Sequence, residues 1–226
     1  VYGGYSKSGY ASNNSVVISG GSVWSNVYGG HSESGTASNN SVLVSGGSAN
    51  AIYGGSGFFG NASHNSVFIS GGNINESVSG GDTFSGNANN NSVFISGGNI
   101  GENVIGGRSN SGNAINNQVS LLGKPVFIKN GVNETIIYGG FSFAPATTGD
   151  LRTGNTLNVF SSGIEAKNIG NIQHYNFLLQ ANSNLKLNLL DVAGTHLGGN
   201  LTPAPTLAMP YVVSGAVLPI NRSITL

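Results

Sequence analysis

The chain has 226 residues, of which only 7% are charged, and its eight acidic and eight basic side chains cancel. Ordinary globular domains carry about 25% charged residues. Without basic clusters there is no electrostatic attraction for nucleic acid or an anionic membrane surface, so we expect no nucleic-acid partner. No apolar run approaches the roughly 18 residues of a membrane span, so we expect no membrane insertion by this fragment. The absence of cysteine excludes disulfides, but it is compatible with export because a continuous repeat core can stabilise a protein.

A sequence motif recurs along the first 123 residues at a nearly fixed interval. At 65–72 it is Asn-Ser-Val-Phe-Ile-Ser-Gly-Gly, with close copies at 14–21, 40–47 and 91–98 and a degenerate copy at 117–123. The first glycines of these copies are 26, 25, 26 and 26 residues apart. A period in this range is typical of a solenoid, a propeller or a repeat array. Because the chain begins inside a repeat, we expect it to be a piece of a longer protein.

Two further markers accompany each copy of the motif. A residue followed by two glycines recurs at 2–4, 28–30, 53–55, 79–81 and 105–107, and Gly-x-Ala recurs at 9–11, 35–37, 60–62, 86–88 and 112–114. Each period therefore contains three short segments. We expect three strands per coil.

Residues within the main motif alternate in character, as expected of a β-strand. Val67 and Ile69 take one side, and Ser66, Phe68 and Ser70 take the other. The fold class that follows is all-β: a parallel β-helix with coils of about 25–26 residues, right-handed by the general rule for parallel crossovers. Inward columns are predicted on three walls. The main wall has two, Val16, Val42, Val67, Val93 and Val119, with Ile18, Val44, Ile69, Ile95 and Leu121 beside them. The second wall has Val1, Val27, Ile52, Val78 and Val104, and the tightest wall has Ala11, Ala37, Ala62, Ala88 and Ala114.

Asparagines also recur at one phase, just before each copy of the motif. They are Asn14, Asn40, Asn65, Asn91 and Asn117. Side-chain amides stacked at a corner can hydrogen-bond from coil to coil and satisfy turn groups that no strand reaches. Some of these corners also contain the Asn-x-Ser glycosylation pattern, for example Asn13-Asn14-Ser15, but the repeat explains them without modification.

Charged side chains are phased in the same way. Lys7 with Glu33, and Asp82 with Arg108, are predicted to form exposed pairs that contribute little to stability. Glu76 and Glu102 lie one coil apart, so a shared proton or a calcium ion is conceivable. Two carboxylates fall short of the six to eight oxygen ligands that calcium takes, so we expect no metal and no cofactor.

The pattern changes after Gly123. A loop insertion is expected at about 141–152, followed by a worn copy of the motif at 155–163. We therefore assign 1–171 to the repeats and 172–226 to a β-rich C-terminal cap with a proline-rich tail, because a solenoid must cover its last coil. Strands are predicted at 175–179 and 185–192.

Glycine- and asparagine-rich repeats followed by the segment 171–192, which contains Asn-Ile-Gln-His-Tyr-Asn-Phe-Leu-Leu and Leu-Lys-Leu-Asn-Leu-Leu-Asp-Val, resemble the C-terminal part of passenger domains of bacterial type V autotransporters. The resemblance implies a β-helix at the bacterial cell surface or released outside the cell, with an autochaperone-like cap at the segment. No membrane barrel follows Leu226 in this sequence, so translocation by the same chain is not implied.

Catalytic residues are not expected. The histidines His31, His64, His174 and His196 fall at unrelated phases, and no cluster of acids with a basic residue suggests polysaccharide cleavage. The chain is therefore expected to be no enzyme. It is expected to act by binding, as an adhesin for host cells, matrix, glycans or other bacteria; the alternatives are a self-associating toxin-like passenger and a fragment of a glycan-acting enzyme.

Two outward columns are the predicted binding residues. One column is apolar, Val17, Leu43, Phe68 and Phe94, continued by Ser120, and the other is aromatic, Tyr2, Tyr28 and Tyr53. A contiguous apolar column on a surface indicates a partner, or cover by the chain's own insertion or tail. Tyrosine rings suit glycans because their faces pack on sugar C–H groups while the hydroxyl stays in water.

Overall fold

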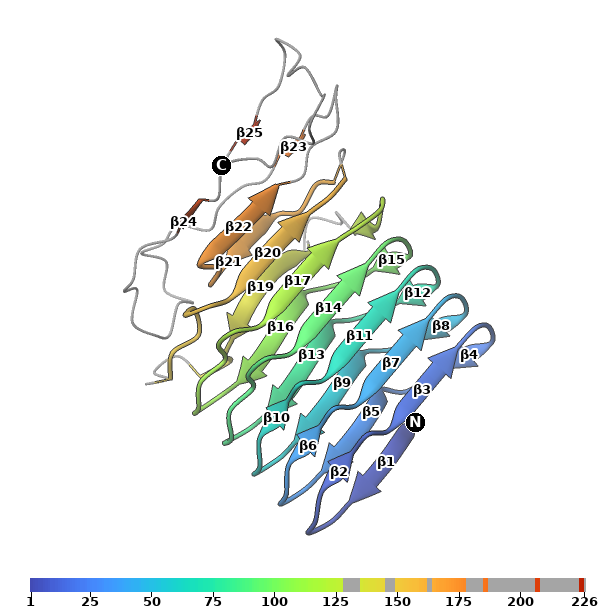
Figure 1. The fold of residues 1–226 in the computed structure, drawn as a ribbon. Helices are drawn as coiled ribbons and strands as arrows, with labels where there is room; N and C mark the ends of the chain where they lie inside the picture. Colours follow the sequence, from blue (N-terminus) through green and yellow to red (C-terminus); the bar gives the residue numbers. More distant parts are fainter. Residues whose placement is uncertain are drawn as a thin grey trace.

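The computed structural model describes residues 1–127, 135–144, 149–161 and 164–177, and three two-residue strands farther along the chain. They form a parallel β-solenoid, in which each strand pairs in parallel with the strand at the same position of the next coil (Figure 1). No helix occurs within these ranges, and in particular none long and apolar enough to cross a membrane. The predicted all-β parallel solenoid is confirmed.

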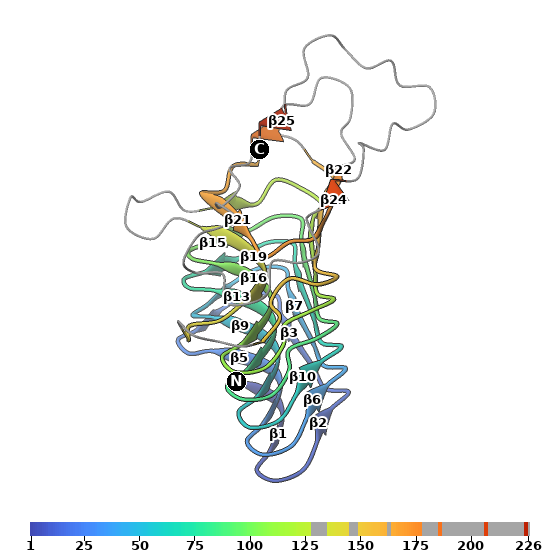
Figure 2. The same cartoon turned by 90° about the vertical axis from the view of Figure 1, so that its left-hand side faces the viewer.

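Four parallel sheets, A to D, run along the solenoid, and sheets A and C lie on opposite sides of it (Figure 2). Sheet A contains β1 (Tyr2–Ser6), β5 (Val27–Ser32), β9 (Ile52–Gly57), β13 (Val78–Thr83), β16 (Val104–Ser109), β19 (Ile136–Phe141) and β21 (Asn168–Gly170). Sheet B contains β2 (Ala11–Ser12), β6 (Ala37–Ser38) and β10 (Ala62–Ser63). Sheet C contains β3 (Ser15–Ile18), β7 (Ser41–Val44), β11 (Ser66–Ile69), β14 (Ser92–Ile95), β17 (Gln118–Leu121), β20 (Thr156–Val159), β22 (His174–Phe177) and β24 (Thr206–Leu207). Sheet D contains β4 (Ser22–Val23), β8 (Ser48–Ala49), β12 (Asn73–Ile74), β15 (Asn99–Ile100) and β18 (Val126–Phe127), and β23 (Leu185–Lys186) pairs separately with β25 (Ile224–Thr225).

Sheet D was not expected, because the sequence predicts three strands per coil. The first three coils have four strands each. The additional strand follows the glycine pair that ends the main motif. The second glycine of this pair adopts positive φ, for example 77° at Gly47 and 91° at Gly72. This turn redirects the chain into a two-residue strand that is too short to show an alternating pattern.

Like residues stack in the predicted register. Val67 pairs with Val42 on one side and Val93 on the other, and all three are fully buried. The alanine column is buried throughout, both in sheet B and in the two following coils, at Ala88 and Ala114. One predicted inward residue, Val1, is 51% exposed, because it is the first residue of the given sequence and a coil covers it on one side only. The interior is otherwise the continuous apolar column that the period predicts.

The asparagine column forms a hydrogen-bonded ladder along the corner between sheets B and C. From Asn14 to Asn91, each side-chain Nδ2 donates to the Oδ1 of the asparagine in the next coil, at 2.9–3.1 Å. The same Oδ1 also accepts a hydrogen bond from the backbone N–H of the ladder asparagine in the preceding coil. From Asn40 onward Nδ2 also donates to an alanine carbonyl, as Asn65 does to Ala37. The predicted coil-to-coil bonding is confirmed.

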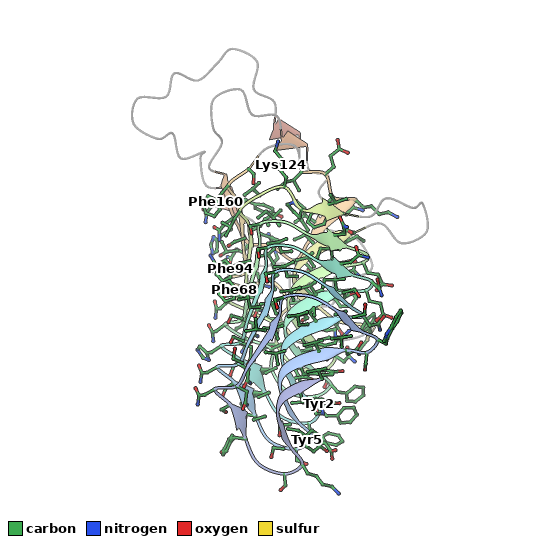
Figure 3. The ribbon with its side chains drawn as sticks, turned by 90° about the vertical axis from the view of Figure 1, so that its right-hand side faces the viewer. Tyr2, Tyr5, Phe68, Phe94, Lys124 and Phe160 are labelled. Carbon is green, nitrogen blue, oxygen red and sulfur yellow. The ribbon has the colours of Figure 1, made fainter. Side chains whose placement is uncertain are left out.

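In the first five coils, the second glycine of the glycine pair in sheet A makes room for this ladder. A Cβ on Gly55 would lie 2.4 Å from the amide of Asn65, and one on Gly30 would lie 2.5 Å from that of Asn40. The chain can pass the ladder only where no side chain intervenes. Residues on either side of the glycine pair, such as Tyr2 and Tyr5, both face outward as a result (Figure 3).

The solenoid continues past the change in sequence pattern. Leu151 packs on Ala88 and Ala114, Asn155 extends the ladder by accepting the N–H of Asn117, and the worn motif supplies β20. Sheet C also runs through the predicted boundary at 171/172, since β20 pairs with β22. Residues 145–148 of the predicted insertion, and most of the predicted cap and tail, lie outside the described residues.

Candidate binding faces

The predicted apolar column forms a stripe on the outer face of sheet C. Val17, Leu43, Phe68 and Phe94, called the apolar stripe below, are in register on four adjacent strands. The side chains of Val17, Leu43 and Phe68 are 63%, 39% and 41% exposed, and Phe94 is half-buried. The rings of Phe68 and Phe94 stack with centroids 4.8 Å apart and planes 6° apart.

The stripe ends at Ser120, which the sequence places in the same column as an outward residue. Ser120 is in that register, but it is buried and accepts a hydrogen bond from the Nδ2 of Asn158 at 3.0 Å. Asn158 in turn accepts from Asn176 at 2.8 Å. Ser120 therefore lies in the predicted column, but here buried polar side chains that bond from coil to coil replace the exposed apolar residues.

The predicted tyrosine column lies on the outer face of sheet A, on the other side of the solenoid from Phe68 and Phe94 (Figure 3). Tyr2 stacks on Tyr28 with centroids 5.0 Å apart, and Tyr28 stacks on Tyr53 at 4.9 Å. Exposure decreases along the column, from 51% at Tyr2 to 8% at Tyr53. Burial raises the pKa of the Tyr28 and Tyr53 hydroxyls. The prediction that Tyr53 is open to a ligand is wrong, because the Arg108 guanidinium covers its ring at 5.4 Å.

A second outward column runs beside the tyrosines, because the residue after each glycine pair also faces outward. His31 lies among Tyr2, Tyr5 and Tyr28, with ring centroids 5.4–5.7 Å apart. Its Nδ1 is buried and has no hydrogen-bond partner in the described part of the chain, and burial lowers the pKa of the imidazole. The Tyr5 hydroxyl donates to the carboxylate of Glu33.

Asp82 and Arg108 belong to this second column and form an ion pair, with Nε 2.5 Å from Oδ1. The pair was expected to be exposed, but its side chains are only 18% and 17% exposed. The guanidinium lies between the rings of Tyr53 and Phe143, 5.4 and 5.1 Å from their centroids. The repeat positions of the charged residues predict that Asp82 and Arg108 pair, but they do not show that aromatic rings enclose the pair. Lys7 and Glu33, the other predicted pair, form no ion pair within the described residues.

A pocket of about 170 Å³ lies beside this ion pair. Its apolar wall consists of Phe58, Phe84 and Phe143, and its polar wall includes Asp82, Arg108 and Asn110. Sequence reasoning missed these residues as a site. The available signal was that each phenylalanine follows the second glycine of its pair by three residues.

Other polar groups remain dispersed. Within the described ranges no three histidine or acidic side chains gather where they could hold a metal ion. Glu102 accepts a hydrogen bond from Ser77 at 3.2 Å, and Glu76 is exposed; the expectation that the two bind no metal stays a prediction. His64 occupies the left-handed corner position that asparagine holds in the neighbouring coils, with φ of 57°. His196 lies outside the described residues.

Comparison of the chain with protein-family models, curated proteins and solved structures finds no match in any of the three. The candidate functions of the chain follow from the two outer faces described above.

Proposed function

We propose that this chain is part of a bacterial surface protein or released passenger of the autotransporter type, and that it acts outside the cell by binding. Its partners are host cells, extracellular matrix, glycans or other bacteria. Support comes from the parallel solenoid, the near absence of charge and the resemblance of the segment 171–192.

The observation that carries the proposal is the apolar stripe on sheet C. Single exposed apolar residues are common on protein surfaces, but soluble monomers seldom expose a contiguous apolar patch without a partner. The stripe spans four adjacent strands, and the backbone hydrogen bonds of sheet C hold it in register. A rigid apolar surface loses little conformational entropy when it binds, which favours affinity.

The sheet A aromatics add a second kind of surface. Tyr2 and Tyr5 are both about half exposed and carry hydroxyls beside apolar ring faces. Such rings combine a large contact area with a polar group, which suits partners that are partly hydrated.

The test is a binding array of glycans and extracellular-matrix proteins, together with adhesion of the purified chain to host cells at low and high salt. Because the outer faces carry few charges, we expect binding that salt changes little. Assembly on lipid vesicles would support a toxin-like passenger instead. Turnover of a polysaccharide panel would support an enzyme fragment, and either result without adhesion would contradict the proposal.

A further inference from the structure

The outer face of sheet A contains an interruption in a column of phenylalanines. Phe58 and Phe84 occupy the same position of adjacent coils, and their rings stack with centroids 5.3 Å apart and planes 8° apart. The next coil has Asn110 at this position, and the coil after that has Phe143. The pocket of about 170 Å³, called the slot below, is lined by this column and by the column of Ser56, Asp82 and Arg108 beside it, and Asn110 is smaller than the phenylalanines around it.

The size of the slot indicates a single ring. Its volume of about 170 Å³ is well below the about 300 Å³ at which pockets for drug-sized ligands begin.

Polar groups on the other side of the slot indicate a ligand with hydroxyls. Asp82 binds Arg108 through Oδ1, and its carboxylate has a second oxygen that can accept. Arg108 has further N–H donors beyond the Nε that it uses for Asp82. The Oδ1 of Asn110 accepts the backbone N–H of Phe143 at 3.2 Å, and its NH₂ group is a donor. Vicinal hydroxyls both donate and accept, so they match this mixed set.

The charge of the slot excludes two other ligand classes. Asp82 neutralises Arg108, so a carboxylate or phosphate would meet a fixed negative charge beside the only positive one that lines the pocket. A wholly apolar ligand would remove a charged pair from water and return no hydrogen bond. A neutral polyhydroxylated ring satisfies both walls.

We infer that the slot, which lies between the phenylalanine column and the Asp82–Arg108 pair, binds one neutral hexopyranose ring of a glycan, with its C–H groups on the phenylalanines and its hydroxyls on Asp82, Arg108 and Asn110. This inference rests on the proposed function, because it names the ligand class for one of the two outer faces. The apolar stripe on sheet C is not involved.

The test uses the whole chain and the methyl glycosides of glucose, galactose and mannose, with a methyl sialoside as the charged comparison, measured by saturation-transfer NMR and calorimetry. Asn110→Phe places a ring in the slot that continues the stack of Phe58 and Phe84, so the fold is kept and the ligand excluded. We expect at least one neutral glycoside to bind, and Asn110→Phe to weaken it about tenfold or more. Phe143→Ala, at an exposed side chain, should weaken binding about threefold or more.

The matched control is Lys7→Phe, which adds a phenylalanine at the same column position of the first coil, away from the slot. It should leave binding within about twofold of the unchanged chain. The bound sugar could belong to a glycoprotein or to a polysaccharide. Testing a glycoprotein and a polysaccharide that carry the same neutral terminal sugar distinguishes these two sources. Both should be sensitive to Asn110→Phe if they use the slot.

Three results would overturn the assignment: no neutral glycoside binds, a neutral glycoside binds Asn110→Phe as well as the unchanged chain, or the sialoside alone is sensitive to that substitution. Adhesion that persists without hexose binding would reject the slot and leave the proposed function standing. Hexose binding lost in Asn110→Phe, in a chain that adheres to no cell, matrix or glycan surface, would keep the slot and reject adhesion.

Discussion

Paired asparagines define the corner that precedes each sheet C strand, and the two members of the pair have different tasks. The first, such as Asn39, adopts left-handed φ of 55–60°, which asparagine tolerates better than most residues. The second, such as Asn40, enters the ladder. The column of second asparagines could be predicted from the sequence because its phase is fixed. The left-handed role of the first could not, because His64 fills it in one coil and hides the pattern.

Removing one ladder residue should destabilise the solenoid strongly. Asn65→Ala would remove the partner of the Ala37 carbonyl and of the backbone N–H of Asn40, and would leave the Nδ2 of Asn40 with only its bond to the Ala11 carbonyl. Buried groups left unpaired cost about 1–3 kcal/mol each, so we expect a loss of about 3 kcal/mol or more in denaturant unfolding. Asn73→Ala, on an exposed side chain, should change stability by less than about 0.5 kcal/mol. Equal effects of the two variants would contradict the structural role of the ladder.

His31 should make stability depend on pH. Its pKa in the folded chain is lowered by burial, so as the pH falls below about 6.5 the unfolded chain takes up the proton first. Stability from His31 is therefore present at neutral pH and lost on acidification. His31→Phe keeps a ring among Tyr2, Tyr5 and Tyr28 but cannot titrate. We expect its Tm to fall less than that of the unchanged chain between about pH 7.5 and 5.5. An identical fall would show that other groups cause the dependence.

At the scale of strands, the alternation of the main motif predicted which side chains are inward. Val67 and Ile69 are buried, and Phe68 between them is exposed. The sequence could not show how the outward columns before and after the glycine pair of sheet A contact each other. For that reason Tyr53 was expected to be open, whereas Arg108 covers it, and the slot at Asn110 was missed. The apolar stripe was found because all its members lie on one strand position.

Val67→Asp tests the continuity of the inward column. A carboxylate there would be fully buried between Val42 and Val93 without a partner, and each coil is stabilised by its neighbours. We expect a loss of at least about 4 kcal/mol and the cooperative loss of several coils, measured by circular dichroism and hydrogen exchange. Ser66→Asp, on the outward side of the same strand, should be far milder. A Val67→Asp chain that melts like its parent would contradict the stacked core.

At the scale of the whole molecule, the solenoid converts a sequence period into long columns of like side chains. The strands of successive coils lie side by side (Figure 1), and their parallel pairing places each outward residue beside its counterpart in the next coil. A preference repeated in the sequence therefore becomes a surface stripe. Few charges interrupt these columns. The result is two outer faces, one apolar and one aromatic with polar groups, and the binding function proposed above rests on them.

The measurement that tests this account most directly combines adhesion with melting temperature for the double variant Phe68→Asn and Phe94→Asn. Asparagine is the natural residue at the same column position in a later coil, Asn158, so the solenoid can accept it. The lost ring stacking should cost only about 0.5–1.5 kcal/mol. We predict that adhesion is lost while the Tm falls by a few degrees at most. Undiminished adhesion, or a collapse in stability showing that the stripe is internal packing, would contradict the claim that this face binds the partner.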